Sequence, residues 1–68
     1  METKLVEVRN DGEILSMMDG SEWMVEVGDM PTVCTWIPTA NIKIDETSSG
    51  YAITNLEIGV SIRASKVN

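Results

Sequence analysis

Turn-forming residues divide the chain into segments too short for an amphipathic helix of ordinary length. Asn10-Asp11-Gly12, Asp19-Gly20 and Thr47-Ser48-Ser49-Gly50 interrupt the chain at short intervals. The Asp-Gly pair is favoured in the tight turns that join antiparallel strands, because both central positions need a positive φ. No window of about 11 residues keeps helical periodicity without an interrupting Gly or Pro. The chain is therefore expected to fold from strands and tight turns.

Between the turns, apolar and polar residues alternate with the period of two that is typical of a half-buried strand. The clearest alternation runs from Leu56 to Ala64, where Gly59 indicates a bulge or bend and allows two short strands instead of one. The other predicted strands are Leu5–Val8, Glu13–Met18, Glu22–Val27, Val33–Ile37, Asn41–Asp45 and Tyr51–Asn55. We expect helical structure at most as one 3₁₀ turn over Pro38–Asn41.

About five to seven short antiparallel strands in 68 residues predict a single all-β domain over residues 1–68. Closure removes exposed strand edges, so we expect a small closed or partly open barrel of the SH3-like type. The C-terminal strand is expected to pair with the N-terminal strand near Leu5–Val8 to close it. The expected core consists of Leu56, Ile58, Val60 and Ile62 together with Trp23, Val25, Ile42, Ile44 and Ile53.

The charge balance argues against two classes of partner. The chain has 5 Lys+Arg, 11 Asp+Glu and no His, for a net charge of −6. Nucleic acids and anionic membranes are both bound through a basic face, so neither is an expected partner.

The apolar runs are also too short to span a bilayer. Met1–Lys4 does not open a signal peptide, which favours a cytoplasmic location, while an already removed signal peptide would allow a periplasmic one.

Three groups of residues carry a resemblance to known sequences. They are Asp19-Gly20-Ser21-Glu22-Trp23, then Trp36-Ile37-Pro38, then Tyr51-Ala52-Ile53-Thr54-Asn55 with Arg63-Ala64 at the end. This arrangement resembles a group of small, uncharacterised bacterial proteins with the pattern D-G-S-x-W, W-x-P-G-D, Y-x-[LI]-x-N and a final R-A. The resemblance implies a compact all-β domain with no assigned activity. Because Thr39-Ala40-Asn41 stands where the pattern has Gly-Asp, a different turn is expected there.

The chain lacks the residue combinations that usually carry catalysis or hold a metal. Without His and with Cys34 as the single Cys, it can form neither a catalytic triad nor a structural zinc site. Cys34 is expected in the core, with an exposed thiol as the alternative. Asp45-Glu46 is too short for a calcium loop, Glu22 and Glu26 are expected to be solvated, and the glycines never form a phosphate-binding loop. We therefore predict no catalytic residue, metal site or cofactor.

Aromatic and methionine side chains remain as candidates for binding. Trp23 is expected to fill the core, whereas Trp36 is compatible with either a buried or an exposed position. Met24 is expected to point outward, and Met17 either joins it at the surface or packs against it across the Asp19-Gly20 turn. The predicted interaction surface therefore comprises Trp36, Tyr51, Met24 and Met17.

Two functions are consistent with these observations. The first is a non-enzymatic module that binds another protein or a second copy of itself. The alternative is a domain for a small ligand or saccharide, with Trp36 and Tyr51 as stacking platforms and Asn41 and Asn55 as polar partners. The alternative requires both rings to be exposed on one concave surface. An enzyme that acts through carboxylates alone is a third, weaker hypothesis.

Overall fold

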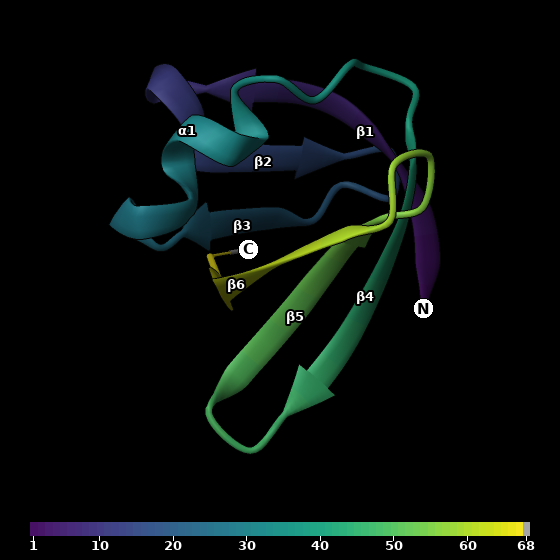
Figure 1. Cartoon of the computed structure of the whole chain (residues 1–68). Helices are drawn as coiled ribbons and strands as arrows, with labels where there is room; N and C mark the ends of the chain where they lie inside the picture. The colour runs from purple at the N-terminus through teal and green to yellow at the C-terminus, as the bar shows by residue number, and fades with distance from the viewer. Residues whose placement is uncertain (68) are drawn as a thin grey trace.

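The computed structural model describes residues 1–67, which form a closed barrel of six antiparallel strands (Figure 1). The strands are β1 (Glu2–Arg9), β2 (Ile14–Met17), β3 (Glu22–Val25), β4 (Asn41–Thr47), β5 (Gly50–Asn55) and β6 (Val60–Lys66). Two 3₁₀ turns, η1 (Asn10–Gly12) and η2 (Val27–Asp29), and the single-turn helix α1 (Met30–Val33) lie between the strands. The predicted small all-β barrel is confirmed.

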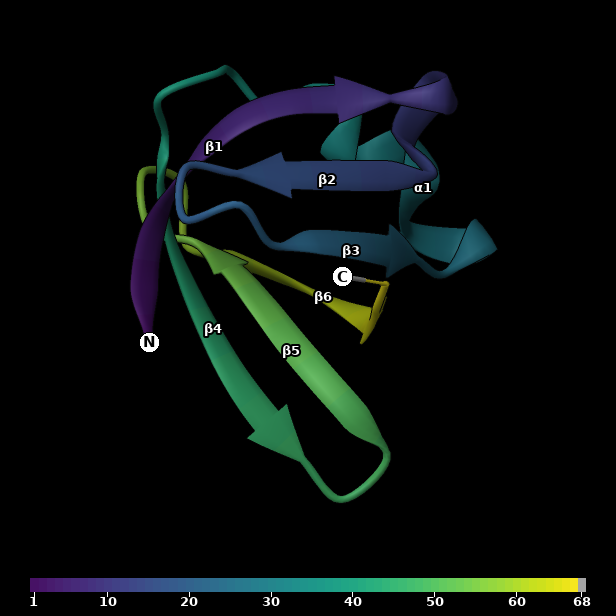
Figure 2. The same ribbon diagram turned by 180° about the vertical axis from the view of Figure 1, so that it is seen from behind.

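The strands follow the order β1-β2-β3-β6-β5-β4 around the barrel, and β4 pairs with β1 to close it. Figure 2 shows β1, β2, β3 and β6 running across one side, with the β4–β5 hairpin extending below them. The prediction that the C-terminal strand pairs with the N-terminal strand is wrong, because β6 lies between β3 and β5. Glu2–Lys4 of β1 instead pairs with Asn41–Lys43 at the start of β4.

The turns between β1 and β2, between β2 and β3, and between β4 and β5 form at the predicted places. Asn10–Gly12 joins β1 to β2 with φ values of 54°, 57° and 100°, a left-handed conformation that Asn, Asp and Gly adopt more easily than other residues. At the β2–β3 turn, Oδ1 of Asp19 accepts the N–H of Ser21 at 2.9 Å. Thr47 pairs with Gly50 across the β4–β5 turn. Local turn chemistry therefore determines these connections.

The alternating segment Leu56–Ala64 is a strand only in its second half. Residues 56–59 form the turn between β5 and β6, and β6 begins at Val60. Ile62 is buried as predicted, but Leu56 is 43% exposed, Ile58 is 57% exposed and Val60 is only partly buried. The expectation that Leu56 and Ile58 lie in the core is therefore wrong.

Asn55 ends the strand despite the alternation that follows it. Its side-chain Oδ1 accepts the N–H of Glu57 at 2.9 Å, and its main-chain oxygen accepts the N–H of Gly59 at 2.8 Å. Gly59 takes a left-handed φ of 70°, which closes the turn without the strain that a side chain would add. An Asn followed four residues later by Gly thus outweighs the period-two pattern.

The predicted strand Val33–Ile37 is also absent, because this segment continues the helical turn of α1. Pro31 occupies the first turn of α1, where its missing N–H removes no helical hydrogen bond. The N–H of Trp36 donates to the main-chain oxygen of Val33 at 3.0 Å. This turn directs Val33 and Trp36 inward and leaves Cys34 exposed, so the prediction of a buried Cys34 is wrong.

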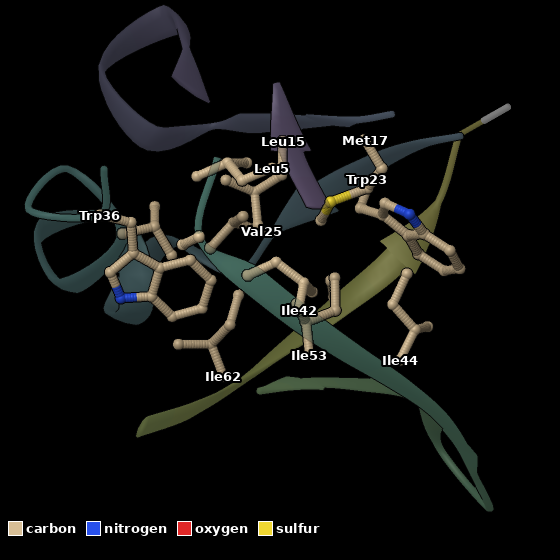
Figure 3. Close-up of a cluster of buried hydrophobic side chains, with 13 residues drawn as sticks. Leu5, Leu15, Met17, Trp23, Val25, Trp36, Ile42, Ile44, Ile53 and Ile62 are labelled. Carbon is tan, nitrogen blue, oxygen red and sulfur yellow. The ribbon is translucent and has the colours of Figure 1, made fainter. Parts of the chain in front are cut away.

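One cluster of buried apolar side chains fills the barrel (Figure 3). Its members are Leu5, Leu15, Met17, Trp23, Val25, Val33, Trp36, Ala40, Ile42, Ile44, Ile53, Ile62 and Ala64. Trp36 and Trp23 lie at opposite ends of this cluster, as Figure 3 shows. The barrel is therefore closed at each end by one indole ring.

Candidate functional site

A pocket of about 270 Å³ opens between the α1–β4 connection and the β5–β6 turn. We name it the Trp36 pocket. Its lining residues are Thr35, Trp36, Ile37, Pro38, Thr39, Ala40, Asn55, Glu57 and Ile58. Both ribbon views place these two connections side by side, although they are separated by two strands in the chain (Figures 1 and 2).

The first wall of the pocket is a β-turn over residues 37–40. The N–H of Ala40 donates to the oxygen of Ile37 at 3.1 Å, with Pro38 and Thr39 at the central positions. Thr39 has a φ of 78°, a left-handed conformation that strains a β-branched residue. The N–H of Thr39 also donates to the oxygen of Leu5 at 2.7 Å, which ties this wall to β1. The predicted 3₁₀ turn is therefore a β-turn.

The second wall is the β5–β6 turn, and Asn41 at the start of β4 holds it in place. The N–H of Leu56 donates to the main-chain oxygen of Asn41 at 2.8 Å. Nδ2 of Asn41 donates to Oε2 of Glu57 at 2.7 Å. Leu5 and Asn41, which hold the two walls, lie at or next to the place where β1 pairs with β4. The pocket is therefore a preformed feature of the fold.

Trp36 connects this pocket to the core. Its side chain is 4% exposed, and its Nε1 is buried without a hydrogen-bond partner in residues 1–67. In Figure 3 the six-membered ring points into the core cluster and the nitrogen lies on the outer side. A buried donor left without a partner costs about 1–3 kcal/mol. The fold therefore tolerates an unfavourable buried donor, Nε1 of Trp36, in the lining of the pocket.

Exposed aliphatic side chains frame the opening. Ile37 is 73% exposed and Ile58 is 57% exposed, and each comes from a different wall. Glu57 is the single charged residue among those that line the pocket. The site thus combines an apolar rim and a carboxylate with a buried indole in its lining.

The structure does not bring the four predicted surface residues together. Met24 is exposed as predicted, but Met17 is 3% exposed and belongs to the core. Met24 pairs with Ile14 and Met17 pairs with Leu5, so the two methionines do not cover each other across the turn. Tyr51 is partly buried against the core, at the end of the barrel away from Trp36.

The predicted stacking platform of Trp36 and Tyr51 is not formed. Tyr51 packs edge-on against Trp23, with ring centroids 4.8 Å apart, and it does not line the Trp36 pocket. Asn55 is buried and shapes the β5–β6 turn, and Asn41 holds Glu57. Both amides predicted as ligand partners therefore have structural hydrogen bonds.

A wider second pocket of about 510 Å³ lies at the Trp23 end of the barrel. Here the indole nitrogen belongs to a hydrogen-bonded network. Nε1 of Trp23 donates to Oγ of Ser21 at 2.9 Å, and this hydroxyl donates to Oδ1 of Asp19 at 2.6 Å. The Ser21 hydroxyl is also the main cause that lowers the pKa of the Asp19 carboxyl below its ordinary value. The Trp23 nitrogen is therefore satisfied within the fold, unlike that of Trp36.

Sequence reasoning missed Ile37, Glu57 and Ile58 as site residues. It assigned Ile37 and Ile58 to strands because it gave the alternation of apolar residues precedence over turn signals. The Pro38 that follows Ile37, and the spacing of Asn55 and Gly59 around Ile58, are the signals that place both residues at turns.

Comparison with protein-family models, curated proteins and solved structures finds no match to the chain. Within residues 1–67, no three His, Cys, Asp or Glu side chains gather in a way that could hold a metal ion. The same residues contain no helix that is long and apolar enough to cross a membrane.

Proposed function

We propose that this domain is a non-enzymatic protein-interaction module whose Trp36 pocket receives one apolar side chain of a partner. The observation that carries the proposal is the buried, unpartnered Nε1 of Trp36 beside a pocket with an exposed aliphatic rim. Burial of Ile37 and Ile58 against a partner would remove apolar surface from water, which is the main driving force of such association.

The size of the pocket favours a single side chain over a larger ligand. Pockets for drug-sized molecules usually enclose about 300–1,000 Å³, whereas the Trp36 pocket has about 270 Å³. A saccharide would also need an exposed ring face for stacking, and Trp36 is almost fully buried. An aliphatic side chain needs neither a larger volume nor an aromatic platform.

The strain at Thr39 supports a binding role for the same wall. Strained left-handed residues persist where the surrounding structure holds them, and they are common at binding sites. Thr39 is held by its hydrogen bond to Leu5 and lines the pocket. A partner's main-chain carbonyl is the kind of acceptor that the indole N–H of Trp36 lacks.

Nuclear magnetic resonance can test this proposal, because the two indole N–H groups give two separate signals. We would titrate the ¹⁵N-labelled protein with N-acetyl-leucinamide, a probe with one aliphatic side chain and two amides. The Trp36 indole signal is expected to shift, while that of Trp23, which is bonded to Ser21, serves as the internal control. Equal shifts of both signals, or a shift of neither, would contradict the proposal.

A pair of surface variants locates the binding. Ile58→Ser removes an aliphatic side chain from the pocket rim, whereas Val27→Ser removes one from η2, where Val27 is also exposed. The first variant is expected to weaken the Trp36 shift and the second to leave it unchanged.

Self-association through the same surface is the second form of this function. Two copies that each carry a net charge of −6 repel one another, which favours a different protein as partner. Sedimentation equilibrium over a wide concentration range distinguishes the two forms. A monomer at all concentrations is expected, and a dimer that Ile58→Ser dissociates would assign the pocket to self-association.

A further inference from the structure

The charge at the mouth of the Trp36 pocket indicates what should flank the side chain that enters it. Glu57 lines the pocket, and no Lys or Arg does. Among residues 1–67 the ion pairs join Arg9 to Glu7 and Glu22, and Lys43 to Asp45, and none involves Glu57. The carboxylate at the pocket thus has no cationic partner within the described part of the domain.

The Glu57 carboxylate is also held in position before any partner arrives. Nδ2 of Asn41 donates to Oε2 at 2.7 Å, and the main-chain N–H of Asn41 approaches the same atom at 3.4 Å. A group that is already ordered loses less conformational entropy on binding. Lys4 pairs with Asn41 across β1 and β4, but it does not line the pocket.

We infer that the Trp36 pocket binds a peptide segment of another protein in which an aliphatic residue stands next to a lysine or arginine. The aliphatic side chain enters the pocket between Ile37 and Ile58, and the adjacent cation lies against Glu57. This inference rests on the proposed function and adds the chemistry of the partner to it. The net charge of −6 acts in the same direction, because it attracts basic segments from a distance.

Three capped dipeptides of equal backbone length test the inference: acetyl-Leu-Lys-amide, acetyl-Leu-Gln-amide and acetyl-Leu-Glu-amide. Each is titrated at low salt while the Trp36 indole signal is followed. The Lys peptide is expected to bind about two- to five-fold more tightly than the Gln peptide, as fits an exposed ion pair, and the Glu peptide more weakly. Added salt should reduce these differences.

Two variants that change the net charge by the same amount distinguish the effect of the Glu57 carboxylate from the effect of the overall negative charge. Glu57→Gln keeps an oxygen for Asn41 but removes the charge at the pocket, and it is expected to abolish the preference for Lys over Gln. Glu46→Gln removes an exposed charge from β4 at the second pocket and is expected to preserve most of the preference.

The outcomes distinguish this inference from the proposed function. Equal binding of all three peptides with a shift of the Trp36 signal would overturn the cationic partner and leave the apolar pocket intact. A preference for Lys that Glu57→Gln and Glu46→Gln weaken equally would also overturn it, because the net charge alone would then explain the result. No shift with any peptide would contradict the proposed function itself.

Discussion

Trp23 and Trp36 are both buried in the same core, yet their ring nitrogens have opposite surroundings. Trp23 donates to the Ser21 hydroxyl, which in turn donates to Asp19, so its polar atom belongs to a complete local network. Trp36 has no acceptor for its Nε1 in residues 1–67. The first ring has a hydrophobic and a polar role within the fold, whereas the second has only the hydrophobic one.

The walls near the two rings differ in the same way. The β2–β3 turn beside Trp23 uses Asp19 and Gly20, residues suited to a tight hairpin turn. The residue 37–40 turn beside Trp36 places Thr39 at a positive φ. At one end of the barrel Thr39 is strained and Nε1 of Trp36 lacks a partner. At the other end the β2–β3 turn uses suitable residues and Nε1 of Trp23 is hydrogen-bonded. This contrast is what supports the proposed binding role of the Trp36 end.

The largest expected effect comes from a pair of identical substitutions, one in the core and one at the pocket rim. Ile53 is fully buried in β5 between β4 and β6, and Ile58 is 57% exposed. Ile53→Ala is expected to destabilise the domain by about 2–5 kcal/mol, because it leaves a cavity. Ile58→Ala is expected to change stability by less than about 0.5 kcal/mol.

Urea denaturation followed by circular dichroism would measure both free energies of unfolding. If Ile53→Ala no longer folds, Ile53→Val gives a smaller loss of about 0.5–1.5 kcal/mol that remains measurable. A loss for Ile58→Ala as large as that for Ile53→Ala would show that residue 58 belongs to the core, and the distinction between core and pocket rim would fail.

The same pair of residues shows how far sequence reasoning reaches in this chain. Ile53 and Ile58 both sit in alternating segments, and the alternation predicted both as core residues. The pattern succeeds where strand hydrogen bonds are available. This accounts for the confirmed barrel and for the predicted core residues that are buried, namely Trp23, Val25, Ile42, Ile44, Ile53 and Ile62. The pattern fails at Ile58 because the Asn55 side chain and Gly59 give the backbone a turn with its own hydrogen bonds.

The pocket itself could not be predicted, because it lies between two connections that meet only in the closed barrel. Its walls depend on contacts across the chain, from Thr39 to Leu5 and from Glu57 to Asn41. No local pattern encodes these contacts. The sequence did identify Trp36 as a candidate, but whether its ring is buried depends on the helical turn after Pro31, which replaces the predicted strand.

A second prediction tests the comparison of the two tryptophans by replacing each indole with a phenyl ring, which removes the Nε1 donor. Trp23→Phe loses a hydrogen bond and leaves the Ser21 hydroxyl with Asp19 alone. Trp36→Phe loses a donor that has no partner, which offsets part of the lost packing. We therefore expect Trp23→Phe to be more destabilising than Trp36→Phe by about 1–3 kcal/mol.

Thermal unfolding of the two variants beside the natural protein would give this difference, and the lost ring volume is the same in both. Ser21→Ala provides the control, because it removes the acceptor of Trp23 without altering either ring. An equal loss of stability in both Phe variants would mean that the Trp36 nitrogen is satisfied in solution, and the main argument for its binding role would be lost.

The smallest expected effect concerns the strained turn. Thr39 has a φ of 78° and gives its N–H to Leu5. A left-handed conformation costs an ordinary residue about 1–2 kcal/mol, and glycine avoids this cost but loses up to about 1 kcal/mol through its greater freedom in the unfolded chain. Thr39→Gly is therefore expected to stabilise the domain by about 0.5–1 kcal/mol, measured by urea denaturation. Thr39→Ala keeps a Cβ and should change stability less, which makes it the control for loss of the Thr side chain.

If the strain also helps to present the pocket, Thr39→Gly should weaken binding of N-acetyl-leucinamide although it stabilises the fold, since the wall would be more mobile. A Thr39→Gly variant that is destabilised would show that the turn is not strained, and the two ends of the barrel would then differ only in the Trp36 nitrogen.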